Sequence, residues 1–199
     1  MRCEIPDICI SKYKRLLTFN LGVMTHYFIV PGLYGSGENH WQTIFERTGG
    51  NNFKRINQRD WNHPNLEEWA DNIEKTISEY DPSTVVLVGH SMGCPTIAKW
   101  ASKYKKQIKG AMLVAPADLE SRDGLLEFAH LDKYPTEQLG FKSIVVASSN
   151  DPWASLDRSQ YFAQSWGSDF VNIGPAGHIN DQSGLGHWEE GWKFLEKVS

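Results

Sequence analysis

Short apolar runs alternate with segments of helical periodicity along most of this chain, and this alternation limits the folds open to it. Six runs are rich in apolar residues, several of them almost without interruption, and each ends in turn-forming residues. Runs this apolar are typical of parallel strands that are covered on both faces. The predicted strands span residues 26–30, 53–57, 84–89, 110–115, 143–148 and 169–173.

Helical patterns lie between these runs. The clearest covers residues 66–80, where apolar residues recur on one face, Asn65 is a suitable N-cap, and Glu68 completes a box-like start. Others follow Ser91, begin near Ser155, and close the chain. Strands that alternate with helices predict an α/β fold, in which helices cover both faces of a doubly wound, mostly parallel sheet.

Such sheets bind ligands beyond the carboxyl ends of their strands, where the strand order reverses. If the order is 2-1-3-4-5-6, that point lies between the first and third strands. The sequences that follow these two strands are PGLYGSG (31–37) and GHSMG (89–93). Chemistry is therefore expected in these two loops.

The segment from Gly89 to Gly93 fits the G-x-S-x-G pattern of a nucleophile elbow, with Ser91 at its centre. It follows a predicted buried strand directly and precedes a helix, which is the context that the pattern requires. The turn is crowded, so glycine is needed two residues on either side of the serine. Cys94 is a weaker candidate nucleophile because it lies in the first helical turn, and we interpret it as a packing residue.

A serine hydroxyl needs an adjacent base, and the base needs a carboxylate to orient it. His178 follows the last predicted strand on a glycine-bearing loop and is the expected base. His187 is the main alternative, although it reads better as the start of the final helix. Asp151 follows the fifth strand and is the expected acid, with Asp118, after the fourth strand, as the alternative. The chain order serine, aspartate, histidine is typical of α/β-hydrolases.

Such a site also needs an oxyanion hole. One donor is expected to be the backbone N–H of Met92, directly after the nucleophile. The second should come from the glycine-rich loop after the first strand, where Leu33 is the first choice and Tyr34 the second.

Composition excludes several other classes. The chain has 199 residues, enough for one well-buried core, and a net charge of −4 without a basic stripe, so no nucleic-acid partner is expected. No apolar run is long enough for a membrane helix. Three cysteines without metal-ligand spacing indicate a reduced, cytoplasmic setting and no metal site.

From about Met24 onward the sequence resembles the compact serine hydrolases of the retinoblastoma-binding-protein-9 type, including their bacterial relatives. The resemblance is carried by IVPGLYGSGENHWQ (29–42), RDWNHPNLEEW (59–69), VVLVGHSMGC (85–94), GAMLVAPAD (110–118), VVASSNDPW (145–153) and WGSDFVNIGPAGHINDQSGLGHWEEGW (166–192). It implies that Ser91, Asp151 and His178 form the triad. It also implies a minimal, three-layer α/β-hydrolase fold without a lid domain, and the few residues between the fourth and fifth predicted strands agree with this.

The resemblance extends to residues that chemistry alone does not place. Tyr34, His40 and Asn180 are candidate pocket residues, and a structural role is as plausible for His40 and Asn180. Residues 1–23 have no counterpart in the pattern. We therefore expect an N-terminal extension at residues 1–23 and one hydrolase domain at 24–199, and a chain that starts at Met24 should fold and act as the full chain does.

The expected function is hydrolysis of a small ester or related acyl bond, with no cofactor and a small-molecule acyl substrate as partner. An acyltransferase, thioesterase or peptidase would use the same acyl-enzyme, so these alternatives stay open. A protein-interaction module on a hydrolase fold is a further alternative, whose protein partner the sequence does not identify. A dinucleotide-binding protein is disfavoured because GLYGSG (32–37) does not match G-x-G-x-x-G.

Overall fold

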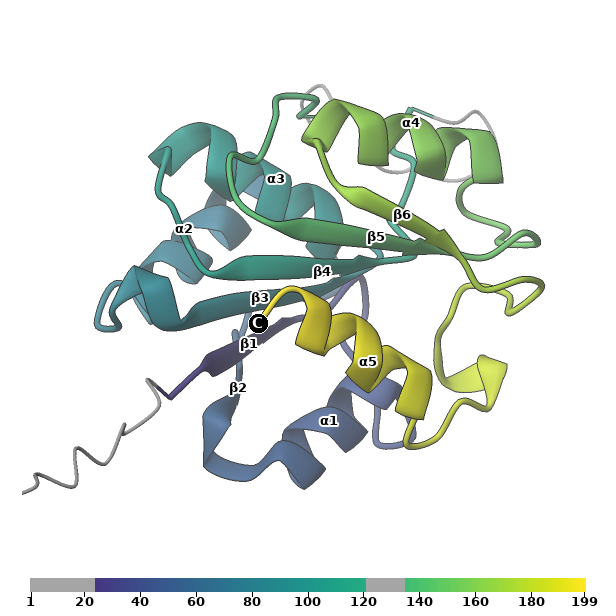
Figure 1. Ribbon diagram of the computed structural model, residues 1–199, viewed down its shortest axis with the longest axis horizontal. Helices are drawn as coiled ribbons and strands as arrows, with labels where there is room; N and C mark the ends of the chain where they lie inside the picture. Colours follow the sequence, from purple (N-terminus) through teal and green to yellow (C-terminus); the bar gives the residue numbers. More distant parts are fainter. Residues whose placement is uncertain (1–23, 121–134) are drawn as a thin grey trace, which may run out of the picture.

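The computed structural model describes residues 24–120 and 135–199 (Figure 1). The predicted extension at residues 1–23 therefore lies outside the described residues. Within them, the chain forms one six-stranded sheet of order β2-β1-β3-β4-β5-β6, and every neighbouring pair is parallel. This confirms the predicted fold class and strand order. The strands are β1 (His26–Val30), β2 (Phe53–Arg55), β3 (Val85–His90), β4 (Gly110–Val114), β5 (Ser143–Ala147) and β6 (Asp169–Asn172).

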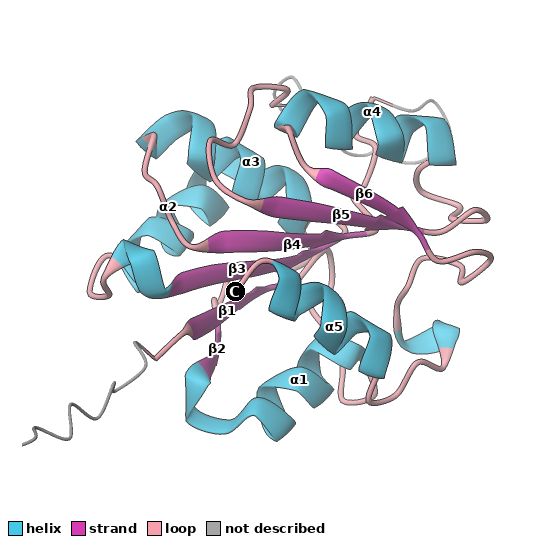
Figure 2. Cartoon of the chain, viewed as in Figure 1, coloured by secondary structure: helices cyan, strands magenta, loops and turns pink. Residues whose placement is uncertain are grey.

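Helices cover both faces of the sheet and produce three layers (Figures 1 and 2). One face carries α1 (Trp41–Gly49) and α5 (Glu189–Lys197). The other carries α2 (Leu66–Ile77), α3 (Gly93–Tyr104) and α4 (Leu156–Trp166). Each parallel connection needs a crossover, and these helices supply most of the crossovers.

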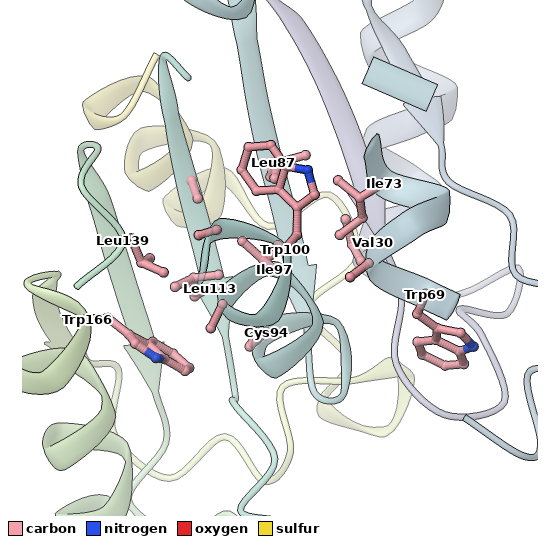
Figure 3. Close-up of a cluster of buried hydrophobic side chains, with 14 of the residues drawn as sticks. Val30, Trp69, Ile73, Leu87, Cys94, Ile97, Trp100, Leu113, Leu139 and Trp166 are labelled. Carbon is pink, nitrogen blue, oxygen red and sulfur yellow. The ribbon is translucent and has the colours of Figure 1, made fainter. Parts of the chain in front are cut away.

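The alternation of side chains in β3 divides the core between the two faces. Leu87 packs with Ile97 and Trp100 of α3 on one face (Figure 3). Val86 and Val88 point to the opposite face, where they join the cluster that α1 and α5 cover. All six residues of β3 are buried, which explains why its sequence is continuously apolar up to Gly89.

Helix α2 follows its predicted pattern with two differences. Asn65 caps it as expected, because its side-chain oxygen accepts from the Glu68 N–H at 3.1 Å. The Glu68 carboxylate, however, binds Arg59 on the preceding loop at 3.0 Å instead of completing a reciprocal box. The helix ends at Ile77, so Tyr80 lies beyond it and packs on the rings of His26 and Phe28.

The start of α5 also differs from the prediction. The helix begins at Glu189, and Trp188 stands at its N-cap with a left-handed backbone (φ 41°). His187 therefore precedes the helix. None of the helices in the described ranges is both long and apolar enough to span a bilayer.

Helix α1 has no counterpart among the predicted helices. His40 caps it, because its Nδ1 accepts from the Gln42 N–H at 3.2 Å. Trp41 and Phe45 then bury their rings against the sheet. His40 is only 4% exposed, and burial lowers its pKa from 6.5 to about 4. The ring is therefore neutral in the folded protein at neutral pH.

This burial predicts a loss of stability in acid that His40→Asn should reduce. The unfolded chain takes up a proton on His40 as the pH falls below 6.5, whereas the folded chain does so only near pH 4. Asparagine offers a side-chain oxygen that can accept the capping hydrogen bond in place of His40 Nδ1, and it does not titrate. Between pH 7.5 and pH 5 the variant should lose about 2 kcal/mol less free energy of unfolding than the parent, measured by urea denaturation. If the parent and His40→Asn lose the same free energy of unfolding between these pH values, the lowered pKa of His40 is wrong.

Candidate active site

The loop between β3 and α3 is a tight turn with Ser91 at its apex. Ser91 has φ 53°, in the left-handed region that residues other than glycine rarely adopt. A Cβ on Gly89 would lie 2.8 Å from the Ile97 side chain, and one on Gly93 only 2.0 Å from the carbonyl oxygen of Val30. The local geometry is thus that of the elbow predicted from the sequence, and both glycines are needed for close packing.

Three loops at the carboxyl edge of the sheet bring Ser91, His178 and Asp151 together. Ser91 Oγ lies 2.9 Å from His178 Nε2, and His178 Nδ1 lies 2.9 Å from both carboxylate oxygens of Asp151. A carboxylate can only accept, so Nδ1 carries the proton and Nε2 accepts from the serine hydroxyl. The side chains of His178 and Asp151 are 10% and 2% exposed. The arrangement can deprotonate the serine and stabilise the imidazolium that results.

The alternative acid Asp118 lies in a different environment. Arg158 of α4 donates two hydrogen bonds to its carboxylate, at 2.7 and 2.9 Å. Glu120 contributes its backbone N–H to the same carboxylate at 3.1 Å. The Asp118 side chain is 2% exposed, and its charge is balanced by the guanidinium. Of the two predicted acids, Asp151 is the one that binds His178.

The alternative base and nucleophile also have other partners. The ring of His187 lies beside the ring of Trp192, with centroids 5.9 Å apart. Cys94 is fully buried, and its thiol donates to the Val114 carbonyl at 3.3 Å. Burial raises the pKa of this thiol well above its usual value, which keeps it protonated and unreactive.

The glycine-rich loop after β1 lies directly against the elbow. A Cβ on Gly32 would stand 2.7 Å from the Cβ of Ser91 and 3.1 Å from the amide nitrogen of Met92. The Tyr34 amide is engaged, because it donates to the Trp61 carbonyl at 2.9 Å. In the described part of the chain, the amides of Leu33 and Met92 have no such acceptor. This difference favours Leu33 over Tyr34 as the second oxyanion donor.

The three candidate pocket residues differ in their surroundings. Tyr34 has φ 64° and is 70% exposed, so its side chain is free to meet a ligand. His40 is buried and packs edge-on against the ring of His90, with centroids 4.6 Å apart. Asn180 caps a short 3-10 helix (Asp181–Ser183) through its side-chain oxygen. His40 and Asn180 therefore have structural roles, and a pocket role for each of the three stays a prediction.

Two polar residues that the sequence analysis missed hold the loop of His178. Ser148 Oγ accepts from the Ala176 N–H at 2.9 Å, and Asn150 Oδ1 accepts from the Gly177 N–H at 2.7 Å. The run SSN (148–150), directly after a buried strand, was the available signal. These bonds tie the loop after β5 to the loop after β6, and so set the distance between Asp151 and His178.

No group of three or more histidine, cysteine, aspartate or glutamate side chains in residues 24–120 and 135–199 is placed to hold a metal ion. The polar groups that do converge are a serine hydroxyl, an imidazole, a carboxylate and the backbone amides of Leu33 and Met92. This set suits attack on a carbonyl carbon.

Solved structures of other proteins share this fold. A YdeN-like hydrolase from Pectobacterium atrosepticum is 36% identical, with a TM-score of 0.77 and coverage of 88% of this chain and 92% of that one. The ydeN gene product from B. subtilis is 20% identical (TM-score 0.70; 88% and 98% covered). MGS-MChE2, an α/β-hydrolase from the metagenome of lagoon sediments, is 14% identical (TM-score 0.63; 87% and 90% covered) and shares the fold.

The search of curated proteins gave no match. A family model described as serine hydrolase matches residues 27–197, which is nearly the whole described chain. Together with the fold of its structural neighbours, this match establishes that the chain belongs to the serine hydrolase family.

Proposed function

We propose that this serine hydrolase cleaves a small ester or related acyl bond through an acyl-enzyme on Ser91. One observation carries the proposal: an unbroken chain of hydrogen bonds runs from the Asp151 carboxylate through His178 to the Ser91 hydroxyl, each 2.9 Å long. A nucleophile, a base and an orienting acid in this sequence of contacts are what acyl transfer to serine requires.

In the first half-reaction, Ser91 Oγ attacks the substrate carbonyl while His178 Nε2 accepts the hydroxyl proton. Asp151 holds the protonated Nδ1 and stabilises the imidazolium. The amides of Met92 and Leu33 donate to the oxyanion of the tetrahedral intermediate. His178 then protonates the leaving alcohol, and the acyl group stays on Ser91.

In the second half-reaction, water attacks the acyl-enzyme, and His178 takes its proton. The oxyanion forms again at the same two amides, and the acid leaves as Ser91 regains its hydrogen. These steps use only side chains, backbone amides and water, so the proposed reaction requires no cofactor.

The substrate is proposed to be small and partly apolar. Trp153 is 40% exposed and lies next to the triad, with its ring centroid 6.2 Å from that of His178. Its backbone N–H donates to Asp151 at 2.9 Å, which fixes the position of the residue. An exposed aromatic ring beside the imidazole offers an apolar surface to an acyl or alcohol group.

Other enzymes can use the same acyl-enzyme. An acyltransferase, a thioesterase or a peptidase would differ only in the acceptor or in the bond that is cleaved, and product analysis with competing nucleophiles separates these activities. An interaction module on this fold would show no turnover at all. The intact hydrogen-bond chain, with distances of 2.9 Å from Asp151 to His178 and from His178 to Ser91, favours an active enzyme over such a module.

Finer assignments belong to the same proposal. The motifs at the elbow and around His178 support a place among the retinoblastoma-binding-protein-9 type of hydrolases, in a single domain at residues 24–199. The mild net charge of −4 favours a small-molecule partner over a nucleic acid. The sparse cysteines favour the cytoplasm.

Ser91→Ala should abolish both covalent labelling and turnover. A fluorophosphonate probe is expected to label the parent once, at Ser91, as identified by peptide mass spectrometry. Hydrolysis of p-nitrophenyl acetate should fall to the background rate in the variant, because alanine has no nucleophilic oxygen. Labelling or turnover that survives the substitution would end the proposal.

A matched pair of substitutions tests the identity of the acid. Asp151→Asn should lower kcat by about 10⁴-fold, because the amide no longer holds the correct tautomer of His178. Asp118→Asn should leave kcat close to that of the parent and instead lower the free energy of unfolding by about 1–3 kcal/mol, because it weakens the buried pair with Arg158. Steady-state kinetics and urea denaturation of both variants check these outcomes, and a reversed pattern would refute the assignment.

Trp153→Ala should raise KM for p-nitrophenyl butyrate about fivefold with little change in kcat, because it removes apolar contact but keeps the backbone N–H that binds Asp151. Tyr161→Ala is a suitable control, since Tyr161 on α4 has a similar exposure of 44%. Equal effects of the two substitutions on KM would argue against a binding role for Trp153.

A further inference from the structure

The backbone directly after the proposed base is strained. Ile179 has φ 47°, a conformation that is unfavourable for a β-branched residue. Its side chain is fully buried in the core cluster beneath α1 and α5. Strain of this kind persists only where the surrounding contacts hold the backbone in place, and such positions cluster at functional sites.

Two buried aromatic side chains donate hydrogen bonds to this strained segment. The Nε2–H of His90 donates to the carbonyl of His178 at 2.9 Å, and the Nε1–H of Trp41 donates to the carbonyl of Ile179 at 2.8 Å. His90 is 5% exposed and Trp41 is 1% exposed. Two consecutive carbonyls are thus held by donors from two different elements, the elbow and α1.

The contact fixes the tautomer of His90. A carbonyl oxygen only accepts, so His90 Nε2 must carry the proton. Burial lowers the pKa of His90 well below 6.5, and the neighbouring rings of His40 and His178 lower it further if they are charged. His90 therefore stays neutral while His178 accepts and releases protons, and it places no second positive charge beside the imidazolium.

We propose that His90 and Trp41 form a positioning pair that holds the backbone of His178 so that its Nε2 stays in line with the Ser91 hydroxyl. The inference rests on the proposed function. His90 is the residue directly before Ser91, so one backbone turn both presents the nucleophile and anchors the base. Any movement of the elbow carries the carbonyl of residue 178 with it, and the distance between the two reacting groups is preserved.

Both accepting carbonyls lie among buried side chains, so their hydrogen bonds cannot be replaced by bulk water. Loss of either donor leaves a buried carbonyl without its partner, which costs free energy unless the loop moves. The strain at Ile179 favours that movement, because the backbone relaxes when it leaves the left-handed region. A displacement of about 1 Å at a catalytic group lowers the rate about 10²-fold. The effect should appear in kcat, because neither side chain is proposed to touch the substrate.

The test compares variants that remove or keep each donor. His90→Leu removes the imidazole donor, whereas His90→Gln carries an N–H at the same number of bonds from the backbone. Trp41→Phe removes the indole N–H together with the five-membered ring and keeps a six-membered aromatic ring in the core. Trp166→Phe is the matched control, because its Nε1–H also donates to a backbone carbonyl, that of Pro135, at 2.8 Å, but Trp166 belongs to the core cluster on the opposite face of the sheet from Trp41.

We expect His90→Leu and Trp41→Phe to lower kcat for p-nitrophenyl acetate by about 10²-fold, with little change in KM. His90→Gln should recover at least about tenfold of the loss, and Trp166→Phe should have the kcat of the parent. Fluorophosphonate labelling should be slower in the two donor-free variants and still occur at Ser91. Rates are taken per folded molecule, with folding checked by near-UV circular dichroism.

A parental kcat in folded Trp41→Phe, or in both His90 variants, would overturn the positioning role. So would an equal loss in His90→Gln and His90→Leu, since the restored donor would then have no effect. If His90→Leu does not fold, Trp41→Phe and His90→Gln still decide the question. Failure of the proposed function looks different, because turnover would then persist in Ser91→Ala or be absent from the parent.

Discussion

Because all six strands run in the same direction, the loops that follow them emerge at one edge of the sheet. The pairing of β3 with β1 and β4 puts the elbow at the centre of this edge, where neighbouring loops can reach it from both sides. Ser91, Asp151 and His178 are far apart in sequence, and the parallel register is what makes them neighbours. The helices on the two faces stabilise the sheet that positions these loops, since they exclude water from strands that are apolar on both sides.

Much of this arrangement can be predicted from residues alone. Apolar runs identify the strands because buried parallel strands have little choice of residue. The G-x-S-x-G pattern identifies the elbow because the turn is too crowded for a side chain two residues before or two residues after the serine. Helix α1 escapes prediction because its N-cap is a histidine, a residue that is uncommon at that position, and because its stability comes from packing of Trp41 and Phe45. The register between neighbouring strands depends on tertiary packing, so the hydrophobic periodicity of each strand does not predict it.

The acid illustrates a different limit of sequence reasoning. Asp118 and Asp151 both follow buried strands at the same edge of the sheet. Their positions in the sequence therefore do not decide which of them binds His178, since both lie between Ser91 and His178. What separates them is Arg158, a residue on α4 whose guanidinium binds Asp118 in the loop after β4 and balances its charge. Long-range pairing of this kind depends on helix orientation. The hydrogen bond from His90 to the carbonyl of His178 is also a long-range contact, and nothing in the sequence around His90 predicts it.

Cys94 has a consequence for the conditions under which such a site works. The sulfur lies three residues from the proposed nucleophile, yet it is fully buried and faces the same carbonyl, that of Val114, to which the Ser91 N–H donates. Peroxides and alkylating agents react with exposed thiolates, and this sulfur is neither exposed nor ionised. The proposed reactive group is the Ser91 hydroxyl, and alcohols resist the oxidants that inactivate thiol enzymes. The chemistry of the elbow is therefore independent of the redox state of its surroundings.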